Sequence, residues 1–408
     1  MSMGKYLPLL AALALGTSVA AANAQEGGPG AAYEPSGLRA GSFVILPSTE
    51  LSATYSDNIF RTDTNTVDDF IFTIEPQVEV QSNWGRHALN LYAGLQHNFY
   101  DDNSDEDNTN WVVGTDGRLD ITGNTNIEGE LSYRRAHEER GTPAALALAA
   151  EPTPYDALEA AVTLNQRFNR MTASVGASYA DLDFDSVDAI GGGTINNDDR
   201  DREEFGQMLR LGYEVSPDTS VFVEGRLNQR RYDLQPPASA VNRDSDGYAV
   251  EAGLSFPATR LIRGEIGIGY QEQTYDSAAF DDVSGLAYHA DVTWLATPLT
   301  TVRFGAGAEV GESTVGGSGG YLAQYGEVGV DHELLRNVIL DGSFRFENAD
   351  YEDVSRNDDY IDAGVGVSYL VNRYAKVRVG YDYAERSSDA VGLDYEENRV
   401  GISLILQR

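Results

Sequence analysis

The chain of 408 residues contains 64 aspartates and glutamates against 29 lysines and arginines, which gives a formal net charge of −35. A surface this negative repels phosphate groups, so nucleic acid is excluded as a partner. Cysteine is absent, which excludes disulfide bonds, thiolate metal sites and thiol chemistry. Hydrophobic residues make up 41% of the chain, too large a share for a disordered acidic protein.

The beginning of the chain has the composition of an export signal. Lys5 supplies positive charge to a short first region, and the apolar stretch 6–19 follows it. Small residues at 22–24 then mark a cleavage site for signal peptidase. The apolar stretch is shorter than the roughly 20 residues that cross a bilayer, which argues against a transmembrane helix. We therefore expect residues 1–24 to be a cleaved signal peptide and 25–42 to be a flexible periplasmic segment.

Most of the remaining chain alternates between apolar and polar side chains with a period of two. In one segment Leu340, Phe344 and Phe346 share one parity. Asp341 and Arg345 take the other parity. This period places one set on each face of a β-strand, whereas a helix needs apolar residues spaced by three and four. The charged face must contact water, so the apolar face must contact hydrocarbon or another sheet.

Eighteen segments of this kind follow one another, and the connections between them alternate strictly between long and short. The segments lie near residues 43–56, 69–82, 86–100, 110–121, 125–138, 157–168, 171–184, 203–215, 220–232, 246–256, 261–275, 284–295, 300–311, 321–334, 338–350, 359–371, 375–386 and 395–407. An even strand number with short turns at one end and long loops at the other is typical of an outer-membrane β-barrel. Both termini of such a barrel lie in the periplasm.

A soluble β-sandwich or β-propeller is the rival architecture. Such folds seldom sustain so many adjacent strands with charges along one whole face. A propeller would also repeat a motif about every 40 residues, and the sequence shows no such repeat. The sequence therefore predicts an all-β fold. It is a transmembrane antiparallel up-and-down β-barrel of about 18 strands over residues 43–408, located in the outer membrane.

One segment departs from the alternation. Between Tyr179 and Asp185, the apolar Leu182 and Phe184 leave the register of their strand. A β-bulge inserts one extra residue and so moves the following side chains to the other face. We therefore predict a bulge or an early strand end at this position.

The end of the first strand carries a family resemblance. Residues 55–60 read Tyr-Ser-Asp-Asn-Ile-Phe, after a short alternating run and before a polar loop. This hexapeptide resembles the opening of the putative beta-barrel porin 2 family, and most of the mature chain follows the same layout of short turns and acidic loops. The resemblance implies an outer-membrane protein found with exopolysaccharide export machinery, and translocation rather than catalysis.

The sequence contains no recognisable catalytic or metal motif. The five histidines are scattered and none joins a serine or carboxylate motif, so no enzyme activity is expected. Residues 101–107 are acidic, but an EF-hand needs Gly where Glu106 stands and Glu where Val112 stands. We expect a solvated loop, no cofactor and no dedicated metal site. Acidic loops can still bridge through Ca²⁺ or Mg²⁺ to lipopolysaccharide phosphates, so lipopolysaccharide and outer-membrane lipid are expected partners.

The charged face of the strands is predicted to line the lumen. The candidate lumen-lining residues, assigned by strand parity, are Arg118, Arg134, Arg210, Arg226, Arg230, Arg263, Arg303, Arg345, Arg378, Glu224, Glu265, Asp291, Glu309 and Asp341. Mixed charges of this kind indicate cross-strand ion pairs and a hydrated interior. Eighteen strands enclose an aqueous channel unless something plugs it.

One long connection differs from the others in composition. Residues 141–155 are rich in alanine and leucine, where the other loops are rich in aspartate and asparagine. An apolar segment left in water is disfavoured, so we expect it to fold inwards as a candidate constriction loop. Its residues are Pro143, Leu146, Leu148 and Pro152, and a short helix is expected between the two prolines. An exposed loop and a contact with a partner chain are the alternatives.

Two functions compete for this barrel. The first is a conduit or partner barrel for export of an extracellular polysaccharide, fed by periplasmic polysaccharide-export proteins. The alternative is a diffusion porin for uptake of small hydrophilic solutes. An adhesive barrel that uses its acidic loops is a third class. The family resemblance favours export, because a fold alone does not determine function.

Overall fold

The computed structural model describes residues 30, 33–146, 148–217, 219–236, 239, 241–256 and 261–408. The expected signal peptide lies outside the described residues. Among the described residues, no helix is long and apolar enough to cross a bilayer. A 3-10 turn, η2 (Ser104–Glu106), lies in one of the long loops.

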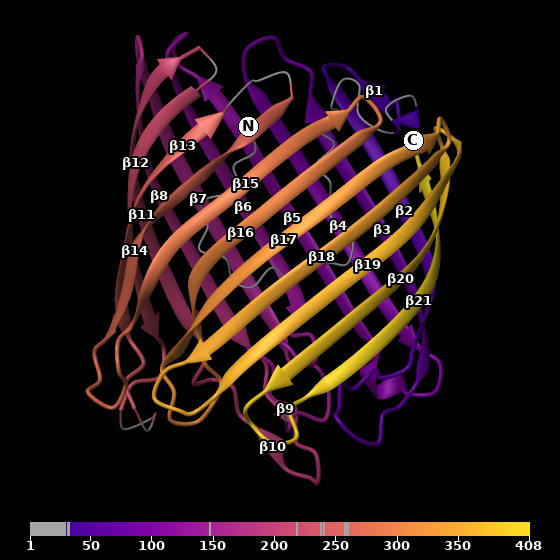
Figure 1. The fold of residues 1–408 in the computed structure, drawn as a ribbon, viewed down its shortest axis with the longest axis vertical. Helices are drawn as coiled ribbons and strands as arrows, with labels where there is room; N and C mark the ends of the chain where they lie inside the picture. Colours follow the sequence, from indigo (N-terminus) through magenta and orange to yellow (C-terminus); the bar gives the residue numbers. More distant parts are fainter. Residues whose placement is uncertain are drawn as a thin grey trace.

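The strands form one closed antiparallel barrel (Figure 1). In the described residues eighteen strands make up the ring. They are β2 (Phe43–Ser56), β3 (Asp69–Ser82), β4 (Ala88–Tyr100), β5 (Asn108–Asp120), β6 (Thr125–His137), β7 (Pro154–Phe168), β8 (Met171–Phe184), β11 (Arg202–Ser216), β12 (Thr219–Tyr232), β13 (Ser245–Phe256), β14 (Ile262–Tyr275), β15 (Val283–Thr297), β16 (Thr300–Glu312), β17 (Gly320–Leu335), β18 (Val338–Tyr351), β19 (Asn357–Asn372), β20 (Ala375–Ser388) and β21 (Tyr395–Gln407). Each strand pairs with its neighbour in sequence, and β21 pairs with β2 to close the ring. The predicted fold class is confirmed.

The outer surface of the barrel is apolar at alternate positions. On β3, Phe70, Phe72 and Ile74 are 50%, 46% and 39% exposed. A belt of large exposed apolar side chains around a whole sheet is disfavoured in water and is matched by the hydrocarbon of a membrane. The residues between them, Thr73 and Glu75 among them, therefore face the interior.

The predicted strand ends differ from the observed ends by three residues at most. The largest difference is the start of β7, which begins at Pro154 rather than at residue 157. Proline is tolerated at the first position of a strand, where it need not donate to the ladder. The prolines at 152 and 154 therefore led to the prediction of a loop, although Pro154 is the first residue of the strand.

The predicted bulge between Tyr179 and Asp185 is wrong. Strand β8 pairs with β7 through Phe184 without any shift of register. Leu182 and Phe184 are 1% and 5% exposed, and they pack in one apolar cluster with Ala136, Tyr155, Ala157 and Ala180. The apolar side chains at this end of β8 therefore face inwards because a core forms there, and the strand itself is regular.

Three short strands were not predicted. β9 (Val187–Asp188) and β10 (Thr194–Ile195) form a small hairpin in the loop between β8 and β11, turned by glycines 191–193 at positive φ. β1 (Leu38–Ala40) lies in the segment expected to be flexible, and it pairs with the first residues of β2. Strand β21 reaches only Ser48 of β2, so β1 pairs with the part of β2 that β21 leaves uncovered. Strands this short show no readable period.

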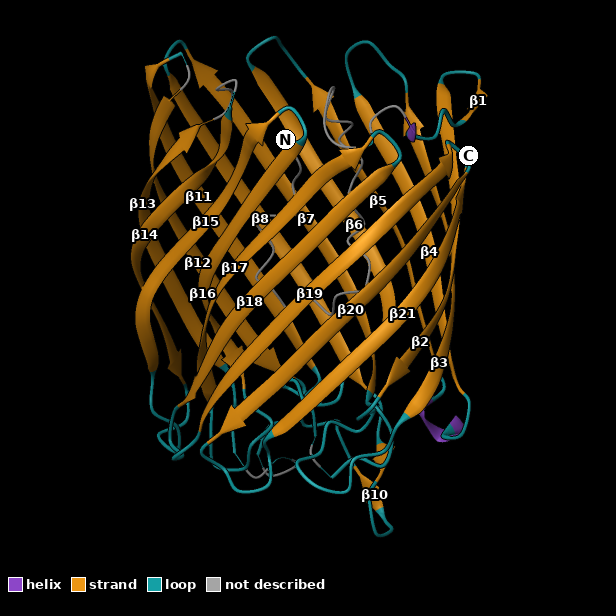
Figure 2. Cartoon of the chain, turned by 45° about the vertical axis from the view of Figure 1, so that its right-hand side comes forward, coloured by secondary structure: helices purple, strands orange, loops and turns teal. Residues whose placement is uncertain are grey.

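The two ends of the barrel differ in their connections. Long loops lie at one end and short turns at the other, where the C-terminus and β1 also lie (Figure 2). In outer-membrane barrels the short turns are periplasmic and the long loops are extracellular. The loop before β5 and the turn before β20 therefore lie on opposite sides of the membrane.

This topology can be tested with protease-cleavable tags. A tag inserted between Asp101 and Asn108 should be cleaved on intact cells, because that loop is extracellular. A tag in the turn Asn372-Arg373 should be cleaved only after the outer membrane is permeabilised. The opposite accessibility would overturn the orientation.

Candidate functional site

The long connection between β6 and β7, residues 138–153, crosses the extracellular opening of the barrel. We call it the mouth segment. Tyr351 Oη of β18 donates a hydrogen bond to the Pro143 carbonyl oxygen at 3.1 Å. Arg386 Nη1 of β20 donates to the Gly141 carbonyl oxygen at 3.1 Å. The ring order β6-β5-β4-β3-β2-β21-β20 puts five strands between β6 and β20. The mouth segment therefore reaches from one wall of the barrel to another.

The expected helix between Pro143 and Pro152 does not occur in the described part of the mouth segment, where turns and an isolated bridge between Ala149 and Ala189 take its place. The reason lies in the partners of its backbone. Ile190 N donates to the Leu148 carbonyl oxygen and Arg140 donates to the carbonyls of residues 149 and 150. Carbonyl groups that bond to Ile190 N or to the Arg140 side chain in this way are unavailable for the bonds within a helix.

The four residues of the candidate constriction loop lie in different environments. Pro143 accepts the bond from Tyr351, and the Leu146 carbonyl accepts one from Ala149 N at 3.3 Å. Leu148 is 68% exposed. Pro152 lines a cavity beneath the mouth segment.

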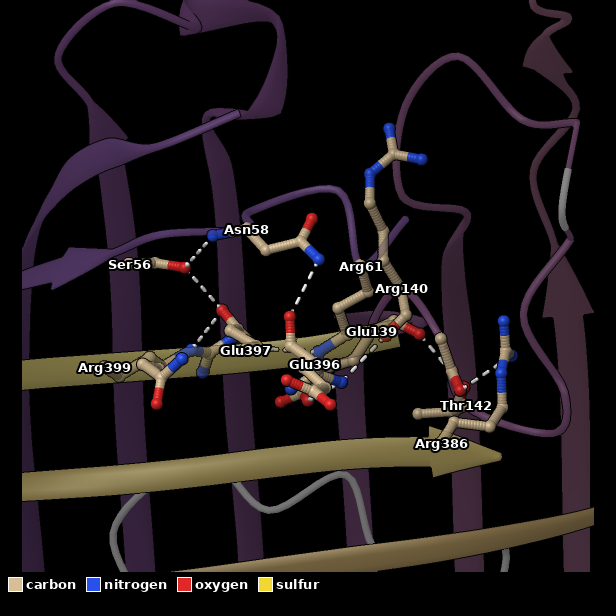
Figure 3. Close-up of polar contacts among 12 residues, drawn as sticks. Ser56, Asn58, Arg61, Glu139, Arg140, Thr142, Arg386, Glu396, Glu397 and Arg399 are labelled. Atoms are coloured by element: carbon tan, nitrogen blue, oxygen red, sulfur yellow. Dashed lines mark hydrogen bonds and ion pairs between the residues drawn. The ribbon is translucent and has the colours of Figure 1, made fainter. Parts of the chain in front are cut away.

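A polar cluster at the junction of β2 and β21 supports the mouth segment (Figure 3). We call it the seam cluster, with Ser56, Asn58, Arg61, Glu397 and Arg399 as its members. The Glu397 carboxylate is fully buried and accepts hydrogen bonds from Ser56 Oγ at 2.6 Å, Arg61 Nε at 2.9 Å and Arg399 Nε at 2.6 Å. Asn58 Nδ2 donates to the Glu396 carbonyl oxygen at 2.9 Å. The first and last strands are therefore joined by side chains as well as by the ladder.

Arg61 connects the seam cluster to the mouth segment. Its Nη1 donates to the Arg140 carbonyl oxygen at 2.8 Å and lies 3.6 Å from a Glu139 oxygen. Burial opposes the charge of this guanidinium, but Tyr395, Glu397 and Glu139 outweigh burial and raise its pKa above the ordinary value. Arg61 therefore stays charged and holds both groups together.

Arg140 fastens the same segment to a third loop. Its Nε donates to Glu106 Oε2 at 2.8 Å, and its guanidinium lies 5.2 Å from the centre of the Phe60 ring. Residues 55–60, which carry the family resemblance, thus contribute Ser56 and Asn58 to the seam cluster. Phe60 of the same hexapeptide contacts Arg140 of the mouth segment.

A cavity of about 370 Å³ lies beneath the mouth segment. On its β3–β5 wall, Thr73 Oγ1 donates to Asn98 Oδ1 at 2.8 Å, and Asn98 Nδ2 donates to Asn108 Oδ1 at 2.9 Å. Asn110 Nδ2 donates to Gln96 Oε1 at 3.1 Å. We call these five residues the amide wall. Its groups are neutral and can both donate and accept hydrogen bonds.

Four of the predicted lumen-lining residues, Arg210, Glu224, Arg226 and Glu265, belong to one ion-pair network on β11–β14. Arg210 lies 3.2 Å from Glu224 and 2.8 Å from Glu265, so it reaches from β11 to β14. Arg226 pairs with Glu224 at 3.6 Å and with Glu251. Arg210 can reach a strand three places away only across the concave face of the sheet.

Most of the other predicted residues also form ion pairs. Arg118 pairs with Asp120, Arg134 with Glu159, Arg230 with Glu312, Arg303 with Asp331, Arg345 with Glu327 and Glu347, and Arg378 with Asp341. Asp291 lies opposite Glu265 in the ladder. For Arg263 and Glu309, no ion pair is formed within the part of the chain that the structure describes.

Sequence reasoning missed several residues of these networks. Glu251 has the inward parity of its strand and could have been found in that way. Arg61 and Arg386 contact the mouth segment from a loop and a strand end, and Arg140 lies within the segment, where no period indicates direction.

The acidic loop 101–107 is closed by hydrogen bonds to Asp69. The Asp69 carboxylate accepts from Asn103 Nδ2 at 2.8 Å and from Asn103 N at 3.0 Å. Across the described residues, no group of three or more histidines and carboxylates is placed to hold a metal ion.

Comparison with known proteins identifies the family. The putative beta-barrel porin 2 family matches residues 31–408. The chain belongs to that family. The predicted family and outer-membrane location are confirmed, and the protein is an outer-membrane β-barrel porin rather than an enzyme. A search of curated proteins finds no match.

Solved outer-membrane proteins of Pseudomonas aeruginosa are similar in structure. OpdO matches with a TM-score of 0.45 at 14% identity, over 89% of this chain and 97% of its own. OpdL matches with a TM-score of 0.44 at 11% identity, over 90% and 99%. The siderophore receptor PirA matches with a TM-score of 0.43 at 8% identity, over 92% and 81%.

The seam cluster should contribute measurably to stability. Replacing Arg61 with alanine leaves the buried Glu397 without one of its two cationic partners, and breaking such a pair costs about 3 kcal/mol. We expect the free energy of unfolding in urea, followed by tryptophan fluorescence of the refolded barrel, to fall by about that amount. Arg118→Ala is the control, because its pair with Asp120 is half exposed and contributes less than about 1 kcal/mol. Equal losses for the two variants would contradict the assignment.

Proposed function

We propose that the protein is an outer-membrane conduit for export of an extracellular polysaccharide, narrowed at its extracellular end by the mouth segment. The observation that supports this most directly is the mouth segment tied across the barrel above a cavity with the amide wall. The predicted lumen-lining residues form the rest of the aqueous wall in this proposal. The family resemblance at residues 55–60 adds the association with polysaccharide export.

The amide wall suits a hydroxyl-rich chain. Side-chain amides and hydroxyls offer donors and acceptors side by side, which is what sugar hydroxyls require. A polymer in transit must bind well enough to enter and weakly enough to leave, so many modest contacts serve better than one tight site. Thr73, Asn98 and Asn110 provide contacts of that kind along neighbouring strands.

The mouth segment suits a gate better than a rigid plug. It is held by hydrogen bonds from individual side chains, such as those of Tyr351, Arg61 and Arg386. Contacts of this kind open locally at lower cost than a strand leaves a sheet. Displacement of the segment therefore leaves the barrel intact and widens its opening.

Shortening the mouth segment tests its role in permeation. Deletion of residues 144–150 should raise the single-channel conductance in planar bilayers, because the narrowest part of the path is removed. Deletion of residues 390–392, an exposed loop tip at the same end, is the matched control and should leave conductance unchanged. Equal conductance in the wild type and the 144–150 variant would exclude the segment from the path.

Loss of the protein separates the two proposed functions in cells. If it exports polysaccharide, a strain lacking it should show reduced extracellular polysaccharide, restored by the wild-type chain. Unchanged polysaccharide together with slower uptake of small hydrophilic solutes would instead support the diffusion porin.

A further inference from the structure

Four carboxylates gather on one wall of the lumen near its periplasmic end. They are Glu79 of β3, Asp116 of β5, and Glu128 and Glu130 of β6, and we call them the acid wall. On β3, the outward positions are those of Phe70 and Phe72, so Glu79 has the inward parity. Each of the four lies within six residues of a short periplasmic turn. Their strands form part of the far wall in Figure 1.

The acid wall contains two like charges that face each other. Asp116 lies directly opposite Glu130 in the ladder between β5 and β6. Like charges directly opposite on one face of a sheet are destabilising. Asp116 accepts a hydrogen bond from Asn90 Nδ2 at 3.0 Å, which is a neutral donor and leaves the charge in place.

No cation neutralises the acid wall. Over the described ranges, none of the four carboxylates forms an ion pair with lysine, arginine or histidine. Arg118 lies opposite Glu128 in the ladder, but its guanidinium pairs with Asp120 at 3.1 Å instead. The nearest arginine in the sequence is therefore already occupied.

Two other like-charged pairs in the lumen are compensated by arginine. Glu224 lies opposite Glu251, and Arg226 pairs with both. Asp331 lies opposite Asp341, and these residues pair with Arg303 and Arg378 respectively. The pair of Asp116 and Glu130 thus differs from these two pairs in having no arginine partner.

The facing wall does not reverse this charge. In the ring order, β14 and β16 are nine places from β3 and β5, halfway round the barrel. At the same periplasmic level they carry Arg263 and Arg303, and Arg303 is paired with Asp331. On these two strands one unpaired arginine therefore faces four unpaired carboxylates, so the facing wall does not offset the charge of the acid wall.

We propose that the acid wall makes this channel selective for cations, and that the polymer it carries is neutral or basic rather than polyanionic. This inference rests on the proposed channel function. A charged wall in a water-filled pore with low-dielectric surroundings concentrates ions of opposite sign and repels those of the same sign. The repulsion between Asp116 and Glu130 opposes folding, so a contribution to stability does not explain this pair. A role in ion selectivity does explain it.

The reversal potential of the full-length barrel in planar bilayers tests the proposal. Under a potassium chloride gradient at low ionic strength, where screening is weakest, the wild type should pass K⁺ more readily than Cl⁻. The double variant Asp116→Asn, Glu130→Gln should lower the K⁺-to-Cl⁻ permeability ratio by about threefold or more. The double variant Asp101→Asn, Asp105→Asn removes the same charge from an exposed extracellular loop and should leave the ratio unchanged.

The outcomes separate the inference from the channel function. A wild type that conducts without cation preference overturns the selectivity while leaving the channel in place, as does a lumen variant that keeps the wild-type ratio. Failure of the wild type to conduct at all contradicts the channel function and the inference with it. Urea unfolding provides a second measurement, because removing the repulsion should leave the lumen variant at least as stable as the wild type. A marked loss of stability would show that the pair is structural and would count against the proposal.

Discussion

A chain that crosses hydrocarbon must satisfy every backbone N–H and C=O within the protein, because no water is present to do so. In this barrel that requirement is hardest to meet at the seam, where β2 and β21 come from opposite ends of the sequence. Strand β21 covers β2 only from Ser48 onward, and β1 pairs with the remaining periplasmic end of β2. At the extracellular end the seam cluster encloses Glu397. The closure of the ring is therefore reinforced by β1 at the periplasmic end and by the seam cluster at the extracellular end.

The strands were the easiest part of this structure to predict. Each strand has lipid on one face and water on the other, so the environment imposes a period of two along its whole length. The prediction failed where the inner face of a strand contacts apolar side chains instead of water. Leu182 and Phe184 face inwards into an apolar cluster, so an apolar side chain there does not indicate the lipid face and the predicted bulge is wrong. Strands of two or three residues, such as β9, are too short to show a period.

The candidate site could be located from the sequence but not built from it. The unusual composition of residues 141–155 identified the segment, and the family resemblance drew attention to residues 55–60. Neither signal shows that Arg61 bonds at once to Glu397 and to the Arg140 carbonyl. That contact joins three distant parts of the chain, and only the closed ring brings them together. The expected helix failed because its carbonyls bond instead to Ile190 of another loop and to the side chain of Arg140.

The position of the seam cluster also determines the order in which the parts of the molecule can assemble. Arg61 and Glu397 are 336 residues apart in sequence. Contacts of such long separation form late, because the loop between them must first be closed. Until β21 docks on β2, Glu397 is missing and Arg61 lacks the partner that orients it towards the mouth segment. A barrel caught before closure therefore keeps the bond between Arg140 and Glu106, whereas the bonds that Tyr351 and Arg386 make across the opening form only as the ring closes.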